Sequence, residues 1–140
     1  MRKVLVNGVF DIIHVGHIEL LKFSRGLGDH LVVAIDSDSR VKSIKGHSRP
    51  FHSFVDRKTV LMSIRYVDEV LCFSSLEDLR SIHASLRPDF LVKGSDWDEK
   101  LLREQDGVLP ETEIVIFDRI GSYSTTSAVE YIIKNEGSLK

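Results

Sequence analysis

Cysteine, proline and a surplus of one charge are all scarce in this sequence: its 140 residues include one cysteine, three prolines and a formal net charge of only −2. A lone Cys72 cannot form an intramolecular disulfide, which excludes a disulfide-rich secreted scaffold and favours a reducing, cytoplasmic location. Cys72 stands inside the apolar run 70–73, which predicts a small buried hydrophobe rather than a nucleophile. No Pro-, Gly- or Ser-rich stretch suggests a linker between domains.

Long hydrophobic runs are also missing. No apolar stretch approaches the roughly 20 residues that span a bilayer, and the N-terminus lacks the apolar segment of a signal peptide. The weak negative charge offers no general attraction for nucleic acid. We therefore expect neither a membrane nor a nucleic acid as a partner, and any bound anion must be held by locally placed groups.

The sequence does contain a regular alternation of short apolar runs and helical patterns. Runs rich in Val, Ile, Leu and Phe predict strands at residues 4–7, 30–35, 69–73, 90–93 and 113–117. Apolar periodicity predicts helices at 18–27, 55–66, 76–86 and 125–135, with N-caps at Ser53, Ser75 and Ser124. Residues 36–52 lack a clear period and are expected to form a mobile loop.

This order of elements predicts an α/β fold: a single Rossmann-like, doubly wound domain over residues 1–140, with a mainly five-stranded parallel sheet and helices on both faces. In such sheets ligands bind beyond the carboxyl ends of the strands. Glycines, histidines, carboxylates and hydroxyls gather after four of the predicted strands, at residues 8–17, 36–38, 94–97 and 119–126. One edge of the sheet is therefore predicted to hold the ligand.

Two histidines three residues apart, His14 and His17, precede the first predicted helix and allow three interpretations. They could bind a metal, although the accompanying glutamate and a third ligand are missing. They could be core histidines satisfied by local hydrogen bonds. With room provided by Gly8 and Gly16, they could also donate N–H groups to a phosphate at the helix N-terminus and stabilise its charge.

The same stretch resembles a known superfamily. Gly8-Val9-Phe10-Asp11 followed by His14-Val15-Gly16-His17 resembles the signature of the nucleotidyltransferases with the HxGH motif, the cytidylyltransferase-like superfamily. Ser124-Thr125-Thr126 resembles its second signature, and the resemblance covers essentially the whole chain. It implies nucleotidyl transfer from a nucleoside triphosphate to a small phosphorylated acceptor, with release of pyrophosphate. It also implies Mg²⁺ that arrives bound to the triphosphate, no metal held by the protein itself, and a homodimer.

The resemblance further implies roles for individual residues. His14, His17 and Lys45 are expected to be catalytic, by contacting the triphosphate around the reacting phosphorus. The nucleotide is expected to bind at Gly8, Val9, Phe10, Gly16, Gly94, Asp96, Arg119, Ser124, Thr125 and Thr126. The acceptor is expected to bind at Asp38, Lys42 and Arg65. Asp11 is expected to be a structural hydrogen-bonding residue of its turn, and Trp97 to pack within its loop.

Two subfamilies compete within the superfamily. Residues 51–54, 57–58, 64–70 and 94–97, with Arg119, resemble glycerol-3-phosphate cytidylyltransferase. Residues 41–46, 49–50 and 91–94 resemble the nucleotidyltransferase domain of bifunctional ADP-heptose synthase, which uses ATP and a sugar 1-phosphate. We expect CMP transfer from CTP to a phosphorylated polyol or sugar, with adenylyl transfer to a sugar 1-phosphate as the alternative. A nucleotide-binding module without catalysis is a further alternative, whereas a Rossmann oxidoreductase is excluded because no G-x-G-x-x-G follows the first strand.

Overall fold

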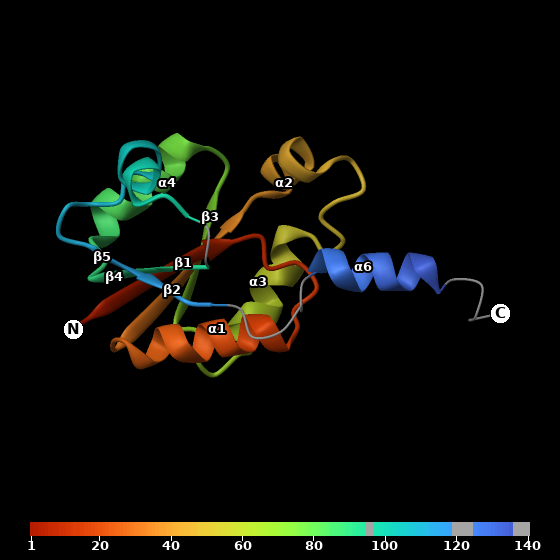
Figure 1. Cartoon of the computed structure of the whole chain (residues 1–140), viewed down its shortest axis with the longest axis horizontal. Coiled ribbons are helices and arrows are strands. Elements are labelled where there is room, and N and C mark those ends of the chain that lie inside the picture. Colours follow the sequence, from red (N-terminus) through yellow and green to blue (C-terminus); the bar gives the residue numbers. More distant parts are fainter. Residues whose placement is uncertain (95–96, 119–124, 136–140) are drawn as a thin grey trace.

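A parallel sheet forms the centre of the molecule, as seen in a computed structural model that describes residues 1–94, 97–118 and 125–135, with backbone only for 125–129. Its strands are β1 (Lys3–Gly8), β2 (His30–Asp36), β3 (Glu69–Phe73), β4 (Phe90–Lys93) and β5 (Glu113–Ile116). They lie in the order β3-β2-β1-β4-β5, and every neighbouring pair is parallel (Figure 1). The predicted doubly wound α/β fold is therefore confirmed, with strand ends that differ from the prediction by at most one residue.

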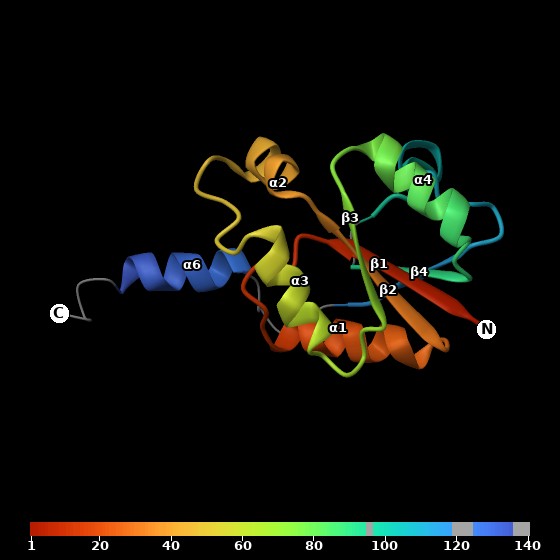
Figure 2. The same cartoon turned by 180° about the vertical axis from the view of Figure 1, so that it is seen from behind.

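Helices cover both faces of this sheet. The helical elements are α1 (Val15–Gly26), α2 (Asp38–Lys45), α3 (Phe54–Met62), α4 (Leu76–Leu86), α5 (Glu99–Leu101), the π-helical turn η1 (Leu102–Asp106) and α6 (Thr125–Lys134). Helices α1 and α3 pack on one face, and α4 and η1 pack on the other. Seen from either side, α6 extends outward from the rest of the chain (Figures 1 and 2).

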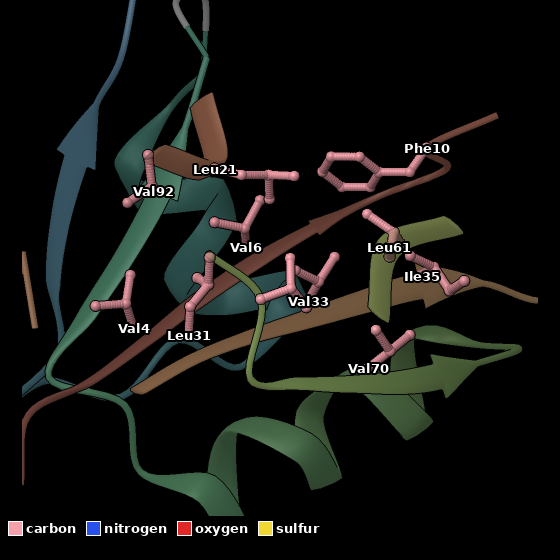
Figure 3. Packing of buried hydrophobic residues seen from close by; sticks show 11 residues of the cluster. Val4, Val6, Phe10, Leu21, Leu31, Val33, Ile35, Leu61, Val70 and Val92 are labelled. Carbon is pink, nitrogen blue, oxygen red and sulfur yellow. The ribbon is translucent and has the colours of Figure 1, made fainter. Parts of the chain in front are cut away.

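Alternation along the strands divides the buried side chains into two cores. Val4 and Val6 of β1 point toward α1 and α3, in what we call the first core (Figure 3). Leu5 points the opposite way, into the second core beneath α4 and η1. Each fully buried Val or Leu contributes about 1.5–3 kcal/mol, so β1, covered on both faces, is held firmly. The candidate site begins at the carboxyl end of this central strand.

The expected mobile loop at 36–52 is wrong in part, because α2 occupies residues 38–45. The side chain of Ser37 caps this helix by accepting from the Arg40 N–H at 3.3 Å. Arg40 Nε also donates to Asp36 Oδ2 at 3.0 Å, and Val41 is fully buried. With Val41 as its one buried residue, α2 shows no apolar period in the sequence.

Other local predictions had mixed outcomes. Ser53 and Ser75 are N-caps as predicted, whereas Ser124 lies outside the described residues. Helix α3 is shorter than expected, α1 starts three residues earlier, and α5 and η1 were not predicted. The predicted burial of Cys72 is wrong: it is exposed near the end of β3, an edge strand with a neighbour on one side only. In the described part of the chain, no helix is both long enough and apolar enough to cross a membrane.

Candidate active site

The paired histidines cap the N-terminus of α1. His14 is the N-cap residue, and its Nδ1 accepts a hydrogen bond from the Gly16 N–H at 3.0 Å. In return, His17 Nδ1 accepts from the His14 N–H at 3.2 Å. This is the reciprocal arrangement of a capping box, with imidazoles in place of the usual hydroxyl and carboxylate. The helix end therefore fixes both rings, whose centroids lie 3.9 Å apart.

This capping determines the tautomer of both rings. A ring nitrogen that accepts from a backbone N–H carries no proton of its own, so in neutral His14 and His17 the proton is on Nε2. Each ring therefore presents Nε2–H as a donor, at the positive end of the helix dipole. Both side chains are half-buried, which makes such donors more effective than they would be in bulk water.

The turn before the histidines has a strained backbone. Phe10 and Ile12 have φ angles of +51° and +34°, in the left-handed region that bulky residues rarely adopt. Such residues cost about 1–3 kcal/mol each and persist only where surrounding contacts hold them. The Phe10 ring is buried in the first core, and a Cβ at Gly8 would lie only 3.1 Å from it. Gly8 thus makes room for Phe10, a packing role beside the expected approach of a ligand.

Asp11 holds the segment that follows α2. Its side chain is 1% exposed and accepts from the N–H groups of Phe51 and His52, at 2.6 and 2.9 Å. Arg49 Nε lies 3.7 Å from the same carboxylate. The predicted structural role of Asp11 is confirmed, because it fastens residues 49–52 to the turn that precedes the histidines.

Arg57 joins the elements around the site from beneath. Its fully buried guanidinium donates to the carbonyl oxygens of Val9, Asp36 and His52 at 3.0, 2.8 and 3.1 Å. It also pairs with Asp38 Oδ1 at 2.8 Å, and this oxygen accepts from the Phe54 N–H as well. Only a planar fork with several donors can satisfy these acceptors together. Asp38, expected to bind the acceptor, is thus engaged in ordering α2 and α3.

Polar side chains also end the three central strands on the second-core face. Each of these side chains lies at or next to the end of its strand, two positions after a residue of the second core. They are Asp36 in β2, after Ala34; Asn7 in β1, after Leu5; and Lys93 in β4, after Leu91. Lys93 Nζ donates to Asn7 Oδ1 at 3.3 Å and lies 4.0 Å from the centre of the Trp97 ring. Burial lowers the pKa of Lys93. The Trp97 indole, expected to pack within its loop, is 54% exposed and lies over this buried lysine of β4.

The structure brings many of the predicted site residues to one edge of the sheet. Five of them follow the carboxyl end of β1, in the turn and the first turn of α1: Val9, Phe10, His14, Gly16 and His17. Lys42 and Lys45 are exposed on α2, which begins directly after β2, and Gly94 follows β4. Their functional roles stay predictions.

Other predicted residues are separate from this edge or outside the described chain. Arg65 is exposed in the turn before β3, where the Asp68 N–H donates to the Leu31 carbonyl at the start of β2. The structure therefore places Arg65 at the opposite edge of the sheet. Asp96, Arg119 and Ser124 lie outside the described residues, and Thr125 and Thr126 are described only as the backbone that begins α6.

Sequence reasoning missed two cations at this site, Arg57 and Lys93. Both had a detectable signal. Arg57 stands on the helix face that also carries Phe54 and Leu61, where an apolar residue is expected. Lys93 ends an apolar strand directly before a glycine, which is the ligand-binding end of a parallel strand.

Comparisons with known proteins agree with the predicted family and the observed fold. A family model described as cytidylyltransferase-like matches residues 5–137. Bifunctional protein HldE of Koribacter versatilis (strain Ellin345) is 51% identical over 96 residues, which are 69% of this chain and 20% of that protein. HldE of Campylobacter jejuni subsp. doylei is 39% identical over 129 residues, 92% of this chain and 27% of that protein. The chain thus spans between a fifth and about a quarter of these curated relatives.

Solved structures extend the comparison. The lipopolysaccharide core biosynthesis protein from Thermoplasma volcanium GSS1 has a TM-score of 0.74 and 30% identity, over 86% of this chain and 98% of that chain. Thermotoga maritima TmcAL, bound with alpha-thio ATP, has a TM-score of 0.65 over 97% of this chain and 51% of that chain, and at 14% identity shares the fold alone. Because the family model covers nearly the whole sheet and both capping histidines, the chain belongs to the cytidylyltransferase-like family of nucleotidyltransferases.

Proposed function

We propose that this protein transfers AMP from ATP to the phosphate of a sugar 1-phosphate and releases pyrophosphate. Two curated relatives that match most of the chain are bifunctional HldE proteins. Residues 41–46 and 91–94 resemble the nucleotidyltransferase domain of bifunctional ADP-heptose synthase, which acts on such substrates. These likenesses favour the adenylyl alternative over CMP transfer, the first expectation from the sequence.

In the proposed reaction, an oxygen of the sugar phosphate attacks the α-phosphorus of ATP. A new P–O bond forms while the bond from the α-phosphorus to the α–β bridging oxygen breaks, and pyrophosphate leaves. The attacking oxygen already carries negative charge, so the reaction needs no strong general base. The protein has to hold both substrates in line and stabilise the charge that spreads over the phosphate oxygens.

The observation that carries this proposal is the reciprocal capping of His14 and His17. Because the backbone occupies Nδ1 of each ring, the two Nε2–H groups are oriented before any substrate binds. Donors arranged in advance stabilise developing charge without the cost of reorganisation. A protein that only bound a nucleotide would not need this pair, which argues for catalysis over a binding module.

The remaining parts of the site fit the same reaction. Lys42 and Lys45 are exposed on α2 with no carboxylate partner within 4.0 Å among the described residues, so both are available to a triphosphate. The backbone N–H groups at the start of α6 would add a second helix N-terminus for phosphate.

Mg²⁺ would enter as part of the substrate, bound to the triphosphate. The carboxylates near the histidines suit this arrangement, because both already have partners within the protein. Asp11 and Asp38 accept from backbone N–H groups and neighbour arginines. In the described part of the chain, no three His, Cys, Asp or Glu side chains are grouped to hold a metal ion.

Pyrophosphate release tests the proposal. ATP, CTP, GTP and UTP would each be combined with a series of sugar 1-phosphates and with glycerol 3-phosphate, in the presence of Mg²⁺. We expect release with ATP and a sugar 1-phosphate, and a nucleotide-sugar product in equal amount. Activity confined to CTP and glycerol 3-phosphate would replace the adenylyl assignment by the cytidylyl one. Absence of release with every pair, while ATP still binds, would favour the binding module.

A further inference from the structure

We propose that the Lys93 ammonium binds the phosphate of the acceptor and holds it on the opposite side of β1 from His14 and His17. This inference rests on the nucleotidyl transfer proposed above and names the cation that receives the second substrate. Lys93 ends β4 at the ligand-binding edge of the sheet, and its side chain is only 6% exposed. Arg65, the arginine expected from the sequence to bind the acceptor, lies at the other edge.

Among the side chains that the structure describes, none gives the buried ammonium a close counterion. Across residues 1–94, 97–118 and 130–135, no carboxylate oxygen lies within 4.0 Å of Lys93 Nζ. Its contacts in these ranges are one long hydrogen bond, 3.3 Å to Asn7 Oδ1, and the Trp97 ring at 4.0 Å. An ammonium has three protons to donate, and a buried charge without an ionic partner is unfavourable. Binding of an anion here would supply the missing partner.

The residues next to Lys93 indicate how an anion would approach it. A Cβ added to the next residue, Gly94, would meet no heavy atom of the described residues within 4 Å. The Trp97 ring that covers Nζ is itself 54% exposed, so the ammonium is one aromatic ring away from solvent. The proposal requires a phosphate to approach Lys93 past the exposed Trp97 ring.

The two faces of the sheet assign this phosphate to the acceptor. The histidines stand at the start of α1, which packs on the first core, whereas the Lys93 side chain points toward the second core. β1 lies between β2 and β4, at the point where the strand order reverses. In-line transfer requires the nucleophile and the leaving pyrophosphate on opposite sides of the α-phosphorus. A triphosphate held by His14 and His17 leaves the Lys93 side for the nucleophile.

Burial and nearby charges act on the Lys93 ammonium in opposite directions. Burial lowers its pKa, while the carboxylates of Asp106 and Asp36 act in the opposite direction. His83, buried on α4, has a pKa lowered to about 4 by burial and by the charge of Lys93, so it brings no second positive charge at pH 7. A phosphate beside Nζ would favour the protonated ammonium.

The first experiment compares Lys93→Met with wild type in the pyrophosphate assay. Methionine has a similar length and no charge, so removing an unpaired buried charge should leave the melting temperature equal or higher. We expect the acceptor KM to rise at least tenfold, while the dissociation constant of ATP, measured by calorimetry without acceptor, changes less than twofold. Lys100→Met, on the exposed surface of α5, is the matched control and should leave both constants unchanged.

The second experiment does not need catalysis. Trp97 is the single tryptophan of the chain, so its emission reports on the ring that covers Nζ. Titration of wild type with inorganic phosphate and with a sugar 1-phosphate should change this emission to saturation. In Lys93→Met, the phosphate concentration at the midpoint of each titration should rise at least tenfold. This readout tests Lys93 even if no pyrophosphate is released by any substrate pair, which would count against the proposed function alone.

Three results would overturn the inference. One is an unchanged acceptor KM in Lys93→Met. Another is a weaker affinity for ATP with an unchanged acceptor KM, which would assign Lys93 to the nucleotide. The third is a Trp97 emission that no phosphate alters in wild type.

Discussion

The imidazoles of His14 and His17 have a structural task, capping α1, and a proposed chemical task, donating to phosphate. Substitutions can separate these two tasks. Asn at an N-cap position and Gln at the third helical position are good capping residues. His14→Asn and His17→Gln should therefore keep the free energy of unfolding within about 0.5 kcal/mol of wild type, because the caps are retained. Turnover should fall on the order of 10²-fold or more, because the imidazole donors are lost.

His14→Ala and His17→Ala provide the comparison, since each also loses its cap and about 1 kcal/mol of stability. Urea denaturation and pyrophosphate release would be measured on all four variants, with Lys58→Ala, exposed on α3, as the control. If His14→Asn and His17→Gln kept wild-type turnover, the histidines would be capping residues only.

His83 predicts a pH dependence of stability. Burial is the main cause that lowers its pKa from 6.5 to about 4 in the folded chain, so between these values the unfolded chain binds a proton that the folded chain does not. The free energy of unfolding should then fall as the pH is lowered from 6.5 to 4, by at most roughly 3 kcal/mol from this residue. Urea denaturation at pH 7, 5.5 and 4 should show this loss in wild type and a smaller one in His83→Leu. His47→Leu, at an exposed position, should behave like wild type, and equal slopes in all three would contradict the prediction.

At single positions, the sequence allowed the histidines to be predicted but not the groups that hold them. His14 and His17 are uncommon residues at a recognisable spacing, whereas their Nδ1 bonds depend on backbone angles that no spacing reveals. Arg57 and Lys93 were missed because charged residues are mostly exposed, and these two are buried through contacts made by distant parts of the chain.

At the scale of elements, the Arg57 side chain joins the ends of β1 and β2, the start of α2 and the segment before α3. Replacing Arg57 with methionine would leave three carbonyl oxygens and one carboxylate oxygen without this donor. We expect Arg57→Met to lose about 3–5 kcal/mol of unfolding free energy. Arg57→Lys should recover only a small part, because an ammonium cannot reach all these acceptors.

The matched control is Lys58→Met, the next residue on the same helix but exposed, which should stay within about 0.5 kcal/mol of wild type. Urea denaturation would measure all three variants. A stability of Arg57→Met equal to that of Lys58→Met would show that the buried guanidinium does not hold the site together.

Elements with a long apolar period were predicted and those without one were not. The strands and α4 have apolar residues at nearly every expected position, and their bounds were close. Helix α2 has one buried residue and depends on the Ser37 cap and the pair between Arg40 and Asp36. Such local hydrogen bonds do not produce a hydrophobic pattern, and a short polar helix is therefore indistinguishable from a loop in the sequence.

At the scale of the whole molecule, the homodimer expected from the family stays a prediction. Tyr131, Ile132 and Ile133 on the outward-extending α6 are more than half exposed in the single chain. Large apolar side chains left exposed in a single chain can mark a protein–protein interface. Light scattering should give about twice the chain mass of 15.9 kDa, and the double substitution Tyr131→Ser and Ile132→Ser should reduce it to one chain. A wild-type mass of one chain would refute the dimer.

The parallel sheet could be predicted because buried apolar strands alternate with helices. Which strands are neighbours, and which helix covers which face, follow from crossovers that pair residues far apart, such as Val4 with Phe90. These pairings bring Lys93 beside Asn7, a contact that sequence distance conceals.

Nitrogen NMR of the two histidine rings, with and without a non-hydrolysable ATP analogue and Mg²⁺, tests the central claim most directly. Without nucleotide, both neutral rings should carry the proton on Nε2 and accept at Nδ1. Addition of α,β-methylene-ATP should shift both Nε2 signals and leave the tautomers unchanged. Protons on Nδ1, or Nε2 signals that saturating nucleotide does not move, would contradict a triphosphate site built on these histidines.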